Sequence, residues 1–124
     1  MLMENISQEL KHQIGQFQQI QQQAQLIVVQ KQNMELQLKE VSNALSELEK
    51  AEDDVKLYKS IGSLFISAKK DPTVEELKEM KESLEIRVSS LKKQEEQITN
   101  KLKEMEKKIS QKLQGTGQEP IQAG

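Results

Sequence analysis

The sequence contains no cysteine, so disulfides and thiolate chemistry are excluded and a reducing cytoplasmic location is the default expectation. It has only one tyrosine and two phenylalanines, and hydrophobic residues make up 35% of the 124 residues. A chain this poor in large apolar side chains is badly equipped to bury a globular core. Charged residues make up 31%, and this composition is typical of long helices and coiled coils.

Glycine and histidine are too scarce for the common catalytic motifs. The five glycines fall at positions 15, 62, 115, 117 and 124, so no glycine-rich phosphate loop is present. His12 is the only histidine and lies outside the heptad positions described below, so a solvent-facing side chain is expected. We therefore predict no catalytic residue, metal or cofactor, and no enzymatic activity.

No long apolar run and no excess of positive charge occur. The longest uninterrupted apolar stretch, residues 26–29, is far too short to span a bilayer, and residues 1–5 lack the features of a signal peptide. The net charge is −2, with lysines and carboxylates interleaved. Neither a membrane nor a nucleic acid is predicted as a partner.

A heptad pattern occupies the first part of the chain. Twelve of fifteen positions spaced alternately by four and three residues are apolar, which predicts a coiled-coil helix over about residues 5–56. These positions are Ile6, Leu10, Gln13, Phe17, Ile20, Ala24, Ile27, Lys31, Met34, Leu38, Val41, Leu45, Leu48, Glu52 and Val55.

A second heptad pattern predicts a helix over about residues 74–113, after a linker at 69–73. Thr73 is the expected N-cap, with Glu76 completing a capping box, and residues 114–124 are expected to be a disordered tail. Nine of its twelve heptad positions are apolar: Val74, Leu77, Lys81, Leu84, Val88, Leu91, Glu95, Ile98, Leu102, Met105, Ile109 and Lys112.

Two narrow apolar stripes predict that the helices pair as an antiparallel coiled coil. If Val55 lies opposite Val74, Phe17 lies near Lys112, and Ile6, Leu10 and Ile14 form an overhang without a helical partner. Two interpretations remain open for this end. Its apolar residues either pack on a neighbouring subunit or simply form a frayed end, or else they form an exposed apolar binding surface. The glutamines in the QFQQIQQQAQ segment, residues 16–25, are either a solvated face or an uncharged contact surface.

The segment between the helices, LYKSIGSLFISA at residues 57–68, follows a different period. It predicts a β-hairpin with Gly62-Ser63 in a type II′ turn, pairing Ile61 with Leu64 and Leu57 with Ala68. One face would carry Leu57, Ile61, Leu64, Ile66 and Ala68, interrupted by Lys59, and the other Tyr58, Ser60, Phe65 and Ser67.

A lone two-stranded hairpin with an apolar face is marginal in water. We therefore predict that hairpins from several subunits join into one sheet or barrel. The alternative is that the hairpin folds back on its own helices. The predicted oligomerisation residues are Leu57, Tyr58, Ile61, Gly62, Leu64, Phe65, Ile66 and Ala68.

The chain resembles a prefoldin subunit of the archaeal β type. The resemblance lies in the order of a heptad helix, the stretch YKSIG with a second short strand, and a capped heptad helix. The most specific stretches are QFQQIQQQAQLIVVQKQNMELQL, EVSNALSEL and DDVKLYKSIGSLFI. The resemblance implies a single prefoldin-like domain that is mainly α, with the hairpin entering an intersubunit β-barrel. It also implies a hexamer of two α and four β subunits.

The resemblance further implies an ATP-independent chaperone that binds unfolded polypeptides at its arm ends and delivers them to a group II chaperonin. The client contacts would then be Ile6, Leu10, Ile14, Phe17, Ile109 and Leu113. A structural coiled-coil adaptor that never holds unfolded proteins is the alternative function.

Overall fold

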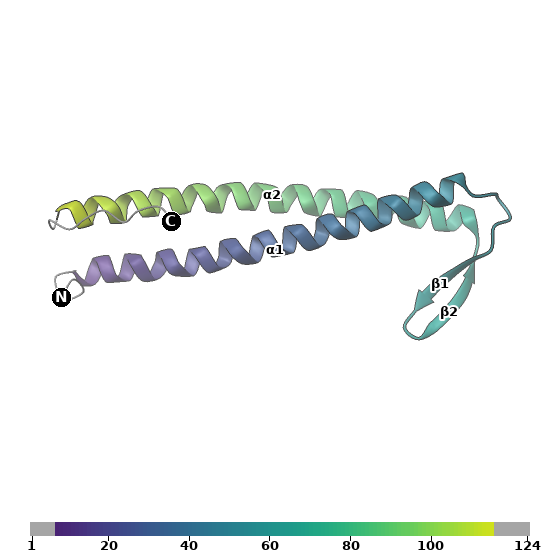
Figure 1. Ribbon diagram of the computed structural model, residues 1–124, viewed down its shortest axis with the longest axis horizontal. Helices are drawn as coiled ribbons and strands as arrows, with labels where there is room; N and C mark the ends of the chain where they lie inside the picture. The colour runs from purple at the N-terminus through teal and green to yellow at the C-terminus, as the bar shows by residue number, and fades with distance from the viewer. Residues whose placement is uncertain (1–6, 116–124) are drawn as a thin grey trace. The chain divides into compact units, whose positions relative to one another are not determined.

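A computed structural model describes residues 7–115 of the chain. The elements follow in the order α1 (Gln8–Lys50), β1 (Leu57–Ile61), β2 (Leu64–Ala68) and α2 (Lys70–Gly115), so the two strands lie between the helices in the sequence (Figure 1). The predicted fold, two long helices joined through one antiparallel hairpin, is confirmed.

The chain divides into two units. The first unit contains residues 1–30 and 91–124 and therefore holds the start of α1 and the end of α2. The second unit, residues 31–90, holds the rest of both helices and the hairpin. Each predicted heptad position from Leu10 to Leu48 in α1, and from Val74 to Lys112 in α2, is buried or half-buried. The heptad assignment within these ranges is therefore correct, and we call these positions the seam.

The first helix begins at an N-cap serine. The Ser7 hydroxyl oxygen accepts a hydrogen bond from the backbone N–H of Leu10 over 3.1 Å, and the Ser7 carbonyl accepts one from the N–H of Lys11. This arrangement satisfies backbone donors that have no partner within the first turn of a helix. The helix start at Gln8 thus lies three residues after the predicted position.

The first helix ends at Lys50, before the predicted end at residue 56. The N–H of Val55 donates to the carbonyl of Glu52, so residues 52–55 form a turn. The ammonium of Lys70 donates to the carbonyl of Ala51 over 2.6 Å and lies 3.5 Å from a carboxylate oxygen of Asp53. A lysine at this point stabilises the negative end of the helix dipole. Glu52 and Val55, two predicted heptad positions, consequently lie outside the helix.

The second helix begins at Lys70, so the predicted linker at 69–73 and the Thr73 N-cap are wrong. Thr73 instead bonds back to the preceding turn, because both its hydroxyl and its N–H donate to the carbonyl of Lys69, at 2.7 and 3.2 Å. Pro72 is compatible with this start, since the N–H groups of a first helical turn have no intrahelical acceptor. The helix continues to Gly115, which places Gln114 and Gly115 in α2, and the rest of the predicted tail lies outside the described residues.

Candidate functional site

The hairpin of the second unit has the register that the sequence predicts. Leu57 pairs with Ala68, Tyr58 with Ser67, Lys59 with Ile66, Ser60 with Phe65, and Ile61 with Leu64. Side chains alternate between the faces of a strand, so the predicted apolar face and its opposite face follow from this register. Tyr58, Ile61, Leu64, Phe65 and Ile66 are all exposed, and Phe65 keeps 77% of its surface accessible.

The turn of the hairpin depends on Gly62. Its φ is +59°, while no non-glycine residue in the described part of the chain has a positive φ. Positive φ at the first central residue and negative φ at Ser63 are the signature of the predicted type II′ turn. Nothing lies within 4 Å of the place where a Cβ would stand at Gly62. The requirement for glycine is therefore conformational and involves no close packing.

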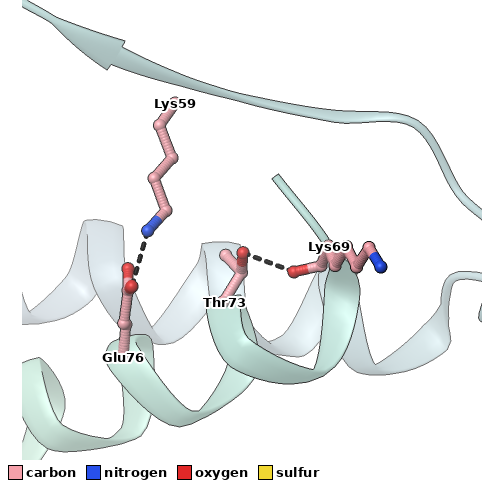
Figure 2. Close-up of polar contacts among 4 residues, drawn as sticks. All are labelled: Lys59, Lys69, Thr73 and Glu76. Atoms are coloured by element: carbon pink, nitrogen blue, oxygen red, sulfur yellow. Dashed lines mark hydrogen bonds and ion pairs between the residues drawn. The ribbon is translucent and has the colours of Figure 1, made fainter. Parts of the chain in front are cut away.

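Lys59 is the charged interruption of the apolar hairpin face, and it reaches across to α2. Its ammonium lies 2.5 Å from a carboxylate oxygen of Glu76. Figure 2 shows this pair beside the hydrogen bond that the Thr73 hydroxyl donates to the carbonyl of Lys69. Leu57, Lys59 and Ala68 are half-buried, whereas the turn end of the same face is exposed. The hairpin is thus attached to α2 near its base and leaves its outer residues uncovered.

The predicted overhang in the first unit is wrong for the residues that the structure describes. Leu10, Ile109 and Leu113 form a buried cluster with exposed fractions of 1%, 2% and 4%. Ile14 and Phe17 are half-buried and pack against it. Lys112 donates to Glu9 over 3.1 Å, whereas the sequence placed Lys112 near Phe17. The stagger differs because α1 ends earlier and α2 begins earlier than predicted. Ile6 lies outside the described residues.

Apolar residues further along α1 leave part of the helix surface uncovered. Leu26 and Val29 are exposed, and the glutamines at 18, 21, 22 and 25 line a shallow groove with Leu102. All of these residues belong to the first unit. The first unit therefore also carries an uncharged surface that mixes amides with aliphatic groups.

Metal-binding groups and membrane-spanning helices do not occur in the part of the chain that the structure describes. Residues 7–115 contain no group of three acidic or histidine side chains positioned to hold a metal ion. No helix within these residues is both long and apolar enough to cross a bilayer. His12 is exposed.

Known proteins share this order of a helix, a hairpin and a second helix. The family model described as "Prefoldin subunit" matches residues 11–116, which is most of the chain. The chain belongs to the prefoldin subunit family. The resemblance inferred from the sequence, including its archaeal β type, is therefore confirmed.

Individual prefoldin relatives agree with this assignment. Prefoldin subunit beta of Thermococcus kodakarensis is 43% identical over 96 residues, which cover 77% of this chain and 82% of the relative. The same subunit of Methanococcoides burtonii is 46% identical over 94 residues, covering 76% and 80%. The crystal structure of the prefoldin beta subunit from Thermococcus strain KS-1 superposes with a TM-score of 0.78. That comparison has 42% identity and covers 87% of this chain and 95% of the other.

Two polar contacts near the hairpin were not predicted from the sequence. Lys59 was visible as a charge on an otherwise apolar face, but nothing in the sequence pointed to Glu76 as its partner. Lys70 fell within the predicted linker, so no sequence feature indicated its contact with the end of α1. Both contacts depend on the way the chain returns after the hairpin.

Proposed function

We propose that this prefoldin subunit acts as an ATP-independent holdase in the cytoplasm. It binds unfolded polypeptides at the end of its helical pair and delivers them to a group II chaperonin. The observation that carries the proposal is the uncovered apolar surface of a chain from a chaperone family. Exposed apolar patches bind other polypeptides, and no nucleotide loop is available to drive the cycle.

Assembly is the proposed role of the hairpin. Five large side chains on two short strands are exposed, and burying each of them stabilises an assembly by roughly 1.5–3 kcal/mol. We infer that hairpins of this chain and of prefoldin α subunits join into a β-barrel, giving a complex of two α and four β subunits. The predicted oligomerisation residues, from Leu57 to Ala68, are the contacts in this proposal.

The assembly is tested by changing Ile61 and Leu64 to lysine. Both residues are exposed, so the change should leave helix content intact while two buried charges oppose barrel formation. Native mass with a co-expressed α subunit should fall well below that of the unchanged complex. Leu36→Lys is the control, because Leu36 is equally exposed but belongs to α1 and to neither hairpin strand. An unchanged mass in the double variant would contradict the assembly role.

Client binding is proposed for Ile6, Leu10, Ile14, Phe17, Ile109 and Leu113. Ile14 and Phe17 are the half-buried members of the described cluster, so they offer surface without being its core. Leu10, Ile109 and Leu113 hold the helices together beneath them. Clients would therefore contact Ile14 and Phe17 directly, and reach the three buried residues only where the helix ends separate.

The function is tested by suppression of aggregation of a chemically unfolded protein, without ATP, by the assembled complex. Ile14→Ser with Phe17→Ser should weaken suppression severalfold, while Leu36→Ser should not. Native mass should be the same for all three proteins. If the double variant suppresses aggregation as well as the unchanged complex does, the client site lies elsewhere. No suppression by any of them would favour the structural adaptor.

A further inference from the structure

A small pocket in the first unit lies on one flank of the seam. It has a volume of about 210 Å³ and is lined by Gln13 and Gln16 of α1 and by Lys101, Met105, Lys108 and Ile109 of α2. Sites for drug-sized ligands are generally larger, at roughly 300–1,000 Å³. A pocket of this size suits one aliphatic side chain of a peptide. Met105, which is half-buried, is its accessible apolar wall, because Ile109 is only 2% exposed.

Gln13 gives the pocket an unused hydrogen-bond acceptor. Its Oε1 is buried, and no donor among the described residues reaches it. A buried acceptor without a donor is unfavourable, so turning the Gln13 side chain outward to accept from a ligand would recover that free energy. Every residue of an unfolded polypeptide except proline carries a backbone N–H. This acceptor can therefore serve peptides of any sequence.

Lys101 and Lys108 give the same pocket a charge preference. Neither lysine forms an ion pair within residues 7–115, although Lys112 nearby is paired with Glu9. Residues 101–113 carry five lysines against two glutamates, Glu104 and Glu106, so the surroundings of the pocket are net positive. Carboxylates on a bound segment would complement this charge.

We propose that this pocket binds acidic-aliphatic segments of unfolded polypeptides. An aliphatic side chain contacts Met105, a backbone N–H donates to Gln13 once that side chain turns outward, and flanking carboxylates pair with Lys101 and Lys108. This inference rests on the proposed holdase function and adds to it a preference among clients. Unfolded segments rich in lysine would bind less tightly, although their apolar side chains fit equally well.

Two fluorescent, unstructured peptides test the preference with the full chain assembled with its α partner. They share the same aliphatic residues and differ only in carrying glutamate or lysine at the charged positions. Fluorescence anisotropy should show the glutamate peptide binding about threefold to tenfold more tightly, the range expected for two exposed ion pairs. High salt should reduce this difference.

Matched variants then locate the preference. Lys101→Glu with Lys108→Glu should abolish or reverse it. Lys103→Glu with Lys107→Glu makes the same change in net charge at exposed positions outside the pocket and should keep it. Gln13→Leu should weaken the binding of both peptides by a similar factor, because both lose the same hydrogen-bond acceptor.

The outcomes separate this inference from the proposed function. Equal affinity for both peptides, with aggregation suppression intact, would overturn the pocket and leave the holdase standing. If both double lysine variants lose the preference for the glutamate peptide, the pocket is also overturned, since overall charge would then explain the effect. Displacement of the glutamate peptide by a single-stranded oligonucleotide at equal concentration would overturn it in favour of a nucleic-acid surface. No peptide binding and no suppression would overturn both proposals.

Discussion

Leu10 of α1 and Ile109 of α2 are the two most deeply buried large side chains in the described chain, and they belong to one cluster. They join the beginning of one helix to the end of the other within the first unit. The contact shows that the two helix ends are paired at this position. The surface proposed for client binding therefore lies around a packed core.

Truncating Leu10 should destabilise this end of the helical pair. Leu10→Ala removes a fully buried side chain and should lower the free energy of unfolding by about 2–3 kcal/mol. Leu26→Ala, on the same helix but 62% exposed, should change it by less than about 0.5 kcal/mol. Chemical denaturation gives the difference. Amide hydrogen exchange at residues 8–17 and 105–113 should accelerate only in the first variant. Equal effects of the two changes would mean that the cluster contributes little stability.

Gly62 and Gly15 should respond in opposite directions to alanine. At Gly62 a Cβ meets no atom but the φ of +59° is strained for an L residue, so Gly62→Ala should disfavour the hairpin by about 1–2 kcal/mol. Gly15 lies inside α1 with equally open space, so Gly15→Ala should stabilise the helix by about 0.5–1 kcal/mol. Amide exchange of the strand N–H groups and thermal unfolding distinguish the two. A Gly62→Ala protein with unchanged strand protection would contradict the assigned turn.

The Lys59–Glu76 pair should couple the hairpin to α2. Both side chains are more than a third exposed, so we expect a coupling free energy of only about 0.2–1 kcal/mol from a double-mutant cycle with Lys59→Met and Glu76→Gln. The charge-swapped protein, Lys59→Glu with Glu76→Lys, should recover part of it. Lys78 and Glu75, 3.9 Å apart within α2, provide a control pair with weaker coupling. Strand amide protection that is identical in all four proteins of the first cycle would show that this pair does not position the hairpin.

Patterns that repeat along the chain could be read from the sequence. The seam positions from Leu10 to Leu48 and from Val74 to Lys112 are those the heptads predict, because burial on a helix follows its period. The hairpin register was equally readable, since a two-residue turn at Gly62-Ser63 fixes each cross-strand pair.

Helix ends could not be predicted in the same way. The end of α1 depends on Lys70 bonding to Ala51, and the start of α2 includes Pro72 and Thr73, which by themselves resemble a boundary. These local errors shifted the inferred stagger of the helices. Leu10 consequently appeared as part of an unpaired overhang, although it lies in the core. An apolar residue near the end of a sequence pattern does not reveal whether it has a partner.

Lys70 also makes the joining of the two helices independent of the hairpin strands. Its ammonium joins the start of α2 to the end of α1 over 2.6 Å, and its side chain is only 13% exposed. The helix ends are thus bridged by a contact that uses no strand residue, and the hairpin resembles a cassette inserted between two fixed anchor points. Such a cassette can be lengthened, duplicated or replaced without redesigning the two helices.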